Sequence, residues 1–244
     1  MVLIFREMST FKFKEFLVEQ DRCAMKIGTD GVLLGAWSPI PENCLSVLDI
    51  GTGTGIIALM LAQRSSAEQI DAIEIDENAY EQASENFENS PWSDRLFCFH
   101  AGLDELIEEP EDEYDLIISN PPFYTENYKT QDAQRDTARF EDAMPFELLI
   151  EAADLLLSEN GIFSVIIPFK EEAQFIALAN EFELFPLKIT RVKGTPTSEI
   201  KRTLLAFSRN KIDDFPVDEL IIETERHVYT EEYIALTKDF YLKM

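Results

Sequence analysis

The sequence is poor in positive charge, in histidine and in cysteine. Its 244 residues include 21 Lys and Arg against 47 Asp and Glu, a net charge of -26, so composition does not suggest a protein that holds nucleic acid by bulk electrostatic attraction. Cys23, Cys44 and Cys98 form no close pair, which indicates neither a disulfide framework nor a zinc knuckle. The two histidines belong to no cluster with metal-ligand spacing, so we expect no metal.

Long hydrophobic runs are also missing. No stretch approaches the roughly 18 apolar residues of a membrane helix, and the apolar start at residues 1–6 is too short for a signal peptide. Unpaired cysteines suit a reducing compartment. We therefore expect a soluble, cytoplasmic protein without membrane association, whose oligomeric state stays open, with a monomer as the default.

Positive charge is unevenly distributed. Residues 188–202 hold five basic residues against Glu199 alone, so a local basic patch can persist within the negative average: Lys188, Arg191, Lys193, Lys201 and Arg202.

Short β-rich runs alternate with helical patterns along the chain. The expected strands are residues 45–50, 69–75, 96–100, 114–119, 162–168, 184–193 and 203–208, and the expected helices are 56–64, 78–89, 146–158 and 171–182, with Asn160-Gly161 as a helix-stop signal. This order predicts a single α/β domain with a seven-stranded, mostly parallel sheet and helices on both faces. The last two strands lack a helix between them, which favours an antiparallel hairpin at the sheet edge.

A glycine-rich loop follows the first of these strands. Glycines let the backbone turn tightly and approach a ligand, and such loops occur with NAD, FAD and S-adenosylmethionine. A carboxylate at the start of the loop would repel a pyrophosphate, whereas it would attract a sulfonium and an ammonium group. We therefore expect S-adenosylmethionine as the cofactor, bound by Asp49, Gly51, Thr52, Gly53 and Gly55.

Acidic residues end the next two strands. Glu74 lies about 20 residues after the glycines, where a carboxylate commonly binds ribose hydroxyls, and Ile75 is expected against the adenine face. Asp76 is expected to cap the following helix. At the third strand two alternatives stay open: Asp104 contacts the cofactor adenine, or the backbone of residues 102–103, including Leu103, does so and Asp104 caps a helix.

The fourth strand stops at Asn120-Pro121-Pro122-Phe123. Two prolines can continue neither a strand ladder nor a helix, so they fix the Asn120 side chain and the Pro121 carbonyl. Two fixed acceptors suit an amino group held by its N–H bonds, with its lone pair aimed at a methyl carbon. Phe123 would stack on a planar substrate. The alternative is a rigid turn without chemistry.

These residues carry a family resemblance. The glycine loop, Asn120–Phe123, and the flanks Met25–Trp37 and Tyr229–Leu242 resemble the bacterial tRNA adenine-N6 methyltransferases that act on valine tRNA beside the anticodon. The resemblance spans nearly the whole chain. It implies a Rossmann-like class I methyltransferase fold, S-adenosylmethionine as methyl donor, N6-methyladenosine in tRNA as product and a cytoplasmic role in tRNA processing.

The resemblance also assigns roles to residues. Asn120, Pro121, Pro122 and Phe123 would hold the flipped adenine, with Asn120 also at the cofactor. A cofactor rim would comprise Lys26, Gly28, Thr29 and Asp30, and substrate contacts would come from Phe123, Tyr124, Arg135 and Arg139.

The order of motifs and expected strands divides the chain into three segments. Residues 1–44 would form a lid over the cofactor, with a helix over Thr29–Trp37 capped by Thr29 or Asp30. Residues 45–209 would form the core. Residues 210–244 would follow the last strand as a C-terminal extension, with a Thr-capped helix within Tyr229–Tyr241.

Other functions stay open. The same acceptors can hold a glutamine amide of a protein substrate, and a ribosomal RNA adenine would fit equally. A catalytically idle nucleotide-binding module is a further reading, and the intact Asn120–Phe123 string argues against it.

Overall fold

The computed structural model describes residues 10–108, 113–122 and 144–244. Its main sheet has the order β10-β8-β9-β7-β6-β3-β4-β5, in which only β9 runs antiparallel to its neighbours. The strands are β3 (Ser46–Ile50), β4 (Gln69–Glu74), β5 (Leu96–His100), β6 (Tyr114–Ser119), β7 (Leu157–Pro168), β8 (Phe185–Lys193), β9 (Ile200–Ser208) and β10 (Val217–Ile221). The expected α/β fold and the β8–β9 hairpin are confirmed.

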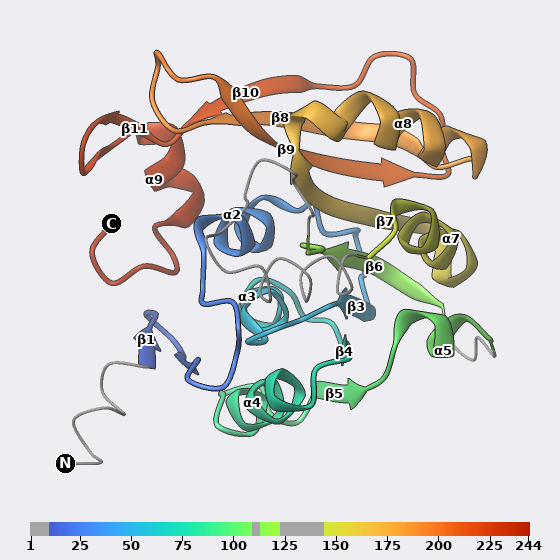
Figure 1. Ribbon diagram of the computed structural model, residues 1–244, viewed down its shortest axis with the longest axis vertical. Helices are drawn as coiled ribbons and strands as arrows, with labels where there is room; N and C mark the ends of the chain where they lie inside the picture. Colours follow the sequence, from blue (N-terminus) through green and yellow to red (C-terminus); the bar gives the residue numbers. More distant parts are fainter. Residues whose placement is uncertain (1–9, 109–112, 123–143) are drawn as a thin grey trace, which may run out of the picture.

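Helices cover both faces of this sheet (Figure 1). They are α2 (Thr29–Trp37), α3 (Ile56–Arg64), α4 (Glu77–Glu88), α5 (Leu103–Glu108), α7 (Phe146–Leu156), α8 (Glu172–Glu181) and α9 (Glu231–Thr237), with the short 3-10 helix η1 (Phe169–Glu171). Successive strand residues face opposite ways. Val47 belongs to the apolar cluster that includes residues of α2, α3 and α9, whereas Leu48 belongs to the cluster that includes residues of α5, α7 and α8. The sheet is therefore buried between two apolar layers.

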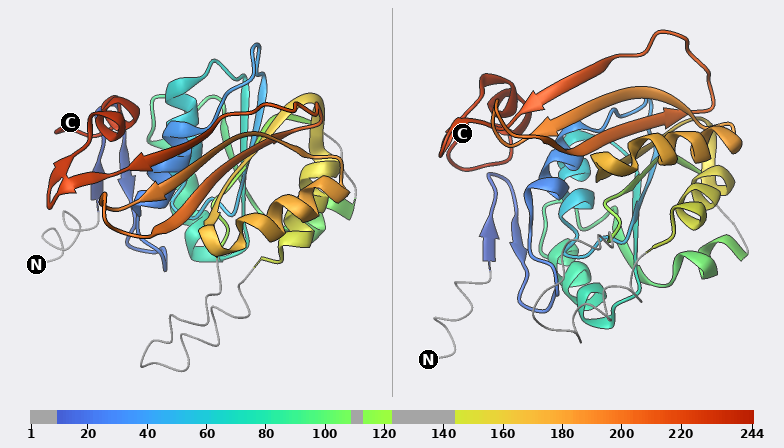
Figure 2. Two further views of the ribbon diagram at one scale, coloured as in Figure 1. Left: turned by 90° about the horizontal axis from the view of Figure 1, so that it is seen from above. Right: turned by 45° about the horizontal axis from the view of Figure 1, so that its top comes forward.

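Two small sheets complete the fold. The β1 (Thr10–Lys12) and β2 (Leu17–Glu19) hairpin lies near the C-terminal residues, and β11 (Glu223–Glu225) pairs with β12 (Val228–Tyr229) next to α9 (Figure 2). An isolated bridge joins Phe13 to Tyr241. The two ends of the described chain thus pack together. Among the described residues, no helix has the length and apolar character needed to cross a membrane.

The expected strand count was wrong by one. β10 is an eighth strand that pairs in parallel with β8, so the β8–β9 hairpin lies one strand inside the edge and the chain after residue 209 adds to the sheet. Val217, Asp218 and Glu219 are exposed, and only Leu220 is buried. A strand with so little apolar alternation gives a weak sequence signal.

The helix stop at Asn160-Gly161 was also wrong. α7 ends at Leu156 and β7 begins at the next residue, with an irregularity opposite β6. A Cβ on Gly161 would lie 2.7 Å from Leu157 Cδ1 and 3.0 Å from the Tyr114 carbonyl oxygen. The glycine therefore permits a close approach within a bulged strand, which is the other common use of glycine in this setting.

The caps predicted for α9 and for α2 had opposite outcomes. Thr230 Oγ1 accepts a hydrogen bond from Tyr233 N at 3.1 Å, which confirms the Thr cap of α9. α2 instead begins after Gly28 without a side-chain cap. Asp30, expected as a capping acceptor, accepts a hydrogen bond from Arg202 Nε at 2.8 Å, so the capping prediction at Thr29 or Asp30 was wrong.

Candidate active site

The register of the sheet brings several predicted site residues together at the carboxyl ends of its central strands. The last residue of β3 pairs with β4 on one side and with β6 on the other. Gly51, Glu74 and Asn120 therefore occupy neighbouring positions at the carboxyl ends of three adjacent strands. Chain order reverses at β3, and open α/β sheets bind ligands in the crevice at such a switch point.

The glycine loop after β3 has a conformation that few other residues adopt. Gly51, Gly53 and Gly55 have φ of 71°, 58° and 81°, in the left-handed region that glycine tolerates best. A Cβ on Gly51 or Gly53 would meet no atom of the described chain within 4 Å, whereas one on Gly55 would lie 2.5 Å from Phe87 Cε1. The first two glycines thus border open space, and the third is also required by packing.

Asp49 lies fully buried beneath this loop. Its Oδ2 accepts hydrogen bonds from Thr52 Oγ1 at 2.6 Å and from Ala58 N at 3.2 Å, while Oδ1 has no partner within the described residues. Burial raises the pKa of Asp49 to about 7, and the charge of Glu74 adds to the rise. The two hydrogen bonds act in the opposite direction and lower the pKa. A buried carboxylate oxygen without a donor fits a cationic ligand group, as a sulfonium cofactor would supply.

Glu74 is fixed by the loop that it faces. Its Oε2 accepts a hydrogen bond from Gly53 N at 2.8 Å and its Oε1 accepts one from Asp76 N at 3.0 Å. Each carboxylate oxygen can accept a further hydrogen bond, so ribose hydroxyls remain suitable donors. Ile75, next in the chain, is 71% exposed, which leaves its face available to an adenine.

Two helices, α4 and α5, begin just after the strands β4 and β5. Some residues at these helix starts have a structural role, and others are candidates for cofactor binding. Asp76 Oδ1 accepts a hydrogen bond from Ala79 N at 2.8 Å, so its predicted role as the cap of α4 is confirmed. α5 begins at Leu103, and Glu105 Oε1 accepts a hydrogen bond from Gly102 N at 3.2 Å. Asp104 is the second residue of α5, so it does not precede the helix as the alternative role of a cap requires. An adenine contact from Asp104 or from Leu103 stays a prediction.

Asn120 lies beside the first turn of α2. A Cβ on Gly31 would lie 4.0 Å from Asn120 Nδ2 and 3.4 Å from Ile56 Cγ2. α2 thus approaches both the end of β6 and the start of α3, and the Asp30–Arg202 contact ties the same turn to β9. From the sequence we assigned Gly31 and Arg202 no role at the site, although a glycine inside a helix is itself a sign of close packing.

The segment before α2 borders the same edge. Lys26 Nζ donates to the carbonyl oxygens of Gln20 and Cys23. Burial raises the pKa of the Cys23 thiol to about 11, and the charge of Glu74 raises it further, with Lys26 opposing. The predicted rim residues Lys26, Gly28, Thr29 and Asp30 therefore belong to a segment close to Glu74 and to Asn120.

Pro121 is buried and Pro122 half-buried after β6. Phe123, Tyr124, Arg135 and Arg139 lie outside the described residues.

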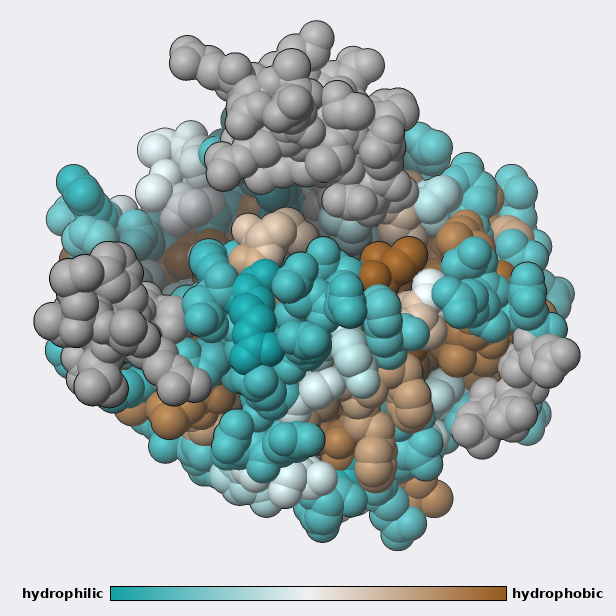
Figure 3. Space-filling view, turned by 60° about the horizontal axis from the view of Figure 1, so that its bottom comes forward, coloured by the Kyte–Doolittle hydropathy of each residue, from teal (hydrophilic) through white to brown (hydrophobic). Residues whose placement is uncertain are grey.

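The expected basic patch is largely neutralised. Arg191 pairs with Glu172 at 2.7 Å, Lys193 with Glu219 at 2.8 Å and Arg202 with Asp30 at 2.8 Å, while Lys188 Nζ lies 4.6 Å from the Trp37 ring centroid. Charge in this run thus serves mainly contacts within the protein. Hydrophilic side chains also dominate the molecular face drawn in Figure 3.

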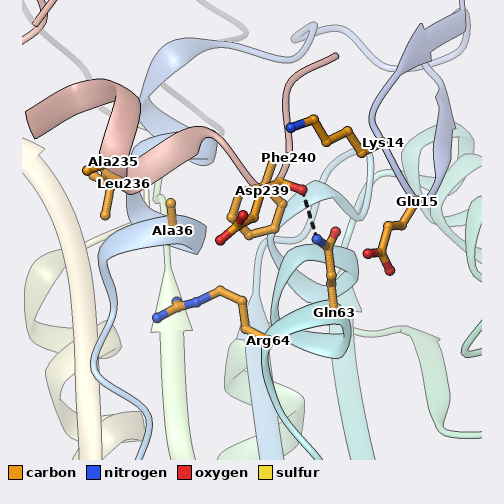
Figure 4. Close-up of a pocket in the computed structure, with 9 residues that line it drawn as sticks. All are labelled: Lys14, Glu15, Ala36, Gln63, Arg64, Ala235, Leu236, Asp239 and Phe240. Atoms are coloured by element: carbon orange, nitrogen blue, oxygen red, sulfur yellow. Dashed lines mark hydrogen bonds between the residues drawn. The ribbon is translucent and has the colours of Figure 1, made fainter. Parts of the chain in front are cut away.

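One hollow of about 560 Å³ lies away from the site (Figure 4). It borders Gln63 and Arg64 at the end of α3, about 12 Å along that helix from its start beside the glycine loop. Gln63 Nε2 donates to the Asp239 carbonyl oxygen at 3.0 Å across it. Arg64 donates to the carbonyl oxygens of Gly35 and Ser38. These contacts join α3 to α2 and the C-terminal residues, so the hollow is a junction between elements and lies apart from the predicted chemistry.

Comparison with known proteins defines the class first. Residues 37–188 match the methyltransferase small domain family. A predicted O-methyltransferase from Agrobacterium tumefaciens, 21% identical, has the same fold with a TM-score of 0.68, over 86% of this chain and 96% of that one. The chain therefore belongs to the methyltransferases with this domain.

Relatives then define the particular family. A Flavobacterium psychrophilum protein is 76% identical and one from Flavobacterium johnsoniae is 75% identical, each over 96% of this chain and the full length of the relative. Both are named tRNA1(Val) (adenine(37)-N6)-methyltransferase. This chain belongs to that family, and the resemblance inferred from the sequence is confirmed.

Proposed function

We propose that this chain transfers a methyl group from S-adenosylmethionine to N6 of an adenosine in tRNA, the adenosine next to the anticodon of valine tRNA. The observation that carries the proposal is the row of Gly51, Glu74 and Asn120 at the sheet switch point, above the unpartnered Asp49 oxygen. The substrate follows from the names of relatives that match nearly the whole chain.

The residues present fit the cofactor. Asp49 offers a buried negative charge and the glycine loop borders open space, while Glu74 offers oxygens for ribose and Ile75 an apolar face. S-adenosylmethionine supplies an electrophilic methyl carbon bonded to a sulfonium. The further contacts that we propose come from Thr52, Gly55, Leu103 or Asp104, and the rim residues Lys26, Gly28, Thr29 and Asp30.

Asn120 and Pro121 position the amino group of the substrate. Asn120 Oδ1 and the Pro121 carbonyl oxygen each accept one N–H of the adenine amino group, which aims the nitrogen lone pair at the methyl carbon. The new N–C bond forms as the S–C bond breaks, and N6 then releases one proton to solvent. These neutral acceptors require neither a strong base nor a metal ion.

The target adenine must unstack from its neighbouring bases to reach the carboxyl ends of the sheet strands. An unpaired anticodon-loop nucleotide costs little to extrude, and Phe123 would stack on the extruded base. Tyr124, Arg135 and Arg139 follow Phe123 in the sequence and are proposed as RNA contacts. We place the enzyme in the cytoplasm, with a monomer as the default for its open oligomeric state.

Paired substitutions test the site assignment. Asn120→Ala should lower turnover by about 100-fold or more, since one positioned hydrogen bond typically has that effect, with the Kd for S-adenosylmethionine nearly unchanged. Glu74→Ala should instead raise that Kd by about tenfold or more, because it removes charged acceptors. Calorimetry and single-turnover methyl transfer measure the two quantities.

Asn160→Ala and Glu159→Ala provide matched controls. Both residues are exposed near the start of β7, at the opposite end of the sheet. Neither variant should change binding or turnover. If Asn120→Ala weakens cofactor binding by the same factor as turnover, the substrate role of Asn120 is wrong.

A further inference from the structure

A second hollow, of about 430 Å³, lies between β1, α9 and the C-terminal residues. Four aromatic side chains line it: Phe11, Tyr229, Tyr233 and Tyr241. Tyr229 and Tyr233 have ring centroids 5.2 Å apart, and Phe11 meets Tyr241 edge to face at 6.2 Å. Tyr233 is 3% exposed, whereas the other three rings are half-buried. The hollow therefore presents aromatic surface to its interior without exposing the rings fully.

Two lysines flank these rings. Lys12 and Lys243 are both exposed and both line the hollow. Their ammonium groups complement phosphate charge, which matters in a chain of net charge -26. Glu223 also lines the hollow, so a phosphate would be favoured on the lysine side and the carboxylate could accept an N–H from a base.

The hollow and the candidate active site border the same helix, α2. Thr29 lines it and is the first residue of that helix. Gly31, in the same helical turn, approaches Asn120 Nδ2. The turn is fixed to β9 by the Asp30–Arg202 contact. A ligand in the hollow would thus lie next to the element that borders the proposed methyl-acceptor position.

We propose that this hollow is a second nucleoside subsite, which binds an unpaired nucleotide near the target adenosine of the RNA. The inference rests on the proposed function. The base lies against the aromatic rings and its phosphate lies near Lys12 and Lys243. Proteins hold single-stranded RNA by this combination of aromatic stacking and basic side chains.

The subsite accounts for RNA binding by an acidic protein. Arg191, Lys193 and Arg202 are engaged by carboxylates of the chain itself, so the basic run contributes little free charge. Stacking depends less on salt than phosphate contacts do. Extrusion of the target base also unstacks its neighbours, which makes a nearby base available to a second aromatic site.

Kinetics of four variants test the subsite. Tyr229→Leu keeps apolar volume and removes the stacking ring, and the double variant Lys12→Gln/Lys243→Gln removes the charge. Each should raise the KM for tRNA by about tenfold, the effect expected for one stacked base or two phosphate contacts. The Kd for S-adenosylmethionine should stay within twofold. Phe97→Leu on β5 and Lys211→Gln after β9 are matched controls with unchanged KM.

A cross-linking measurement avoids dependence on the folding of the variants. Valine tRNA carrying 4-thiouridine in the anticodon loop is irradiated with the wild-type chain, and peptides are identified by mass spectrometry. A cross-link within residues 10–12 or 222–244 is expected. Cross-links confined to other surfaces, or an unchanged KM in both test variants, would overturn the subsite. The proposed function would still stand in that case, provided that the wild type methylates the tRNA. Absence of tRNA methylation by the wild type would refute the function itself.

Discussion

Replacing Asp49 with Asn should stabilise the cofactor-free protein above neutral pH. Asp49 is fully buried, and its Oδ1 has no partner within the described residues. An Asn side-chain oxygen can still accept the hydrogen bonds that Oδ2 takes from Thr52 and Ala58. The substitution therefore removes the cost of a buried charge and keeps the local contacts.

The magnitude follows from the pKa of Asp49. Burial raises this pKa from 3.8 to about 7, so the folded state holds the proton more tightly than the unfolded state. The resulting stability is complete below pH 3.8 and is lost as pH rises through about 7. Each pH unit between the two values lowers the free energy of unfolding by about 1.4 kcal/mol. The total loss of stability has an upper limit of about 4 kcal/mol, and about 3 kcal/mol of it falls between pH 5 and 8.

Urea unfolding at pH 5 and pH 8 measures this difference. The stability of Asp49→Asn relative to the wild type should increase between the two pH values by up to about 3 kcal/mol. The wild type has 47 acidic side chains, and the variant keeps the other 46. Comparing the two proteins at each pH therefore cancels the repulsion among these shared side chains. A gap between the two proteins that stays constant from pH 5 to pH 8 would refute a buried, proton-linked Asp49.

Three further substitutions test the framework around the site. Gly55→Ala should lower the free energy of unfolding by about 3 kcal/mol, because φ is 81° and the new methyl group would meet Phe87; urea unfolding measures it, and a loss below about 1 kcal/mol would contradict the packing. Arg202→Ala should cost less than about 1 kcal/mol yet reduce turnover, because the contact with Asp30 holds the first turn of α2; an unchanged rate would exclude this positioning role. Thr230→Ala should lower thermal stability by the equivalent of about 1 kcal/mol, and no shift would show that the cap of α9 is dispensable.

The sequence predicted most of the sheet because its strands carry clear patterns. Seven expected strands correspond to β3–β9, whose buried residues are largely apolar. β10 escaped because Asp218 and Glu219 face solvent and only Leu220 is buried. Asn160-Gly161 was misread because a glycine after a helical pattern commonly ends a helix, and it equally permits a bulged strand.

The positions of the candidate site residues were predictable where motif residues adjoin a strand end. Asp49, Glu74 and Asn120 each lie at the end of a recognisable strand, and parallel pairing then places them at one edge. The Arg202–Asp30 contact spans 172 residues of sequence, so no local pattern could reveal it. Composition likewise could not show that the basic run is paired, because its carboxylate partners come from other elements.

Methyl transfer to adenine N6 in tRNA is the activity that we propose for this chain. The most direct test incubates the purified chain with S-adenosylmethionine carrying a labelled methyl group and separate fractions of total tRNA, ribosomal RNA and protein, followed by nucleoside and peptide mass spectrometry. We predict labelled N6-methyladenosine in the tRNA fraction, next to the anticodon of valine tRNA, and its loss with Asn120→Ala. Label in N5-methylglutamine or in ribosomal RNA, with none in tRNA, would contradict the account.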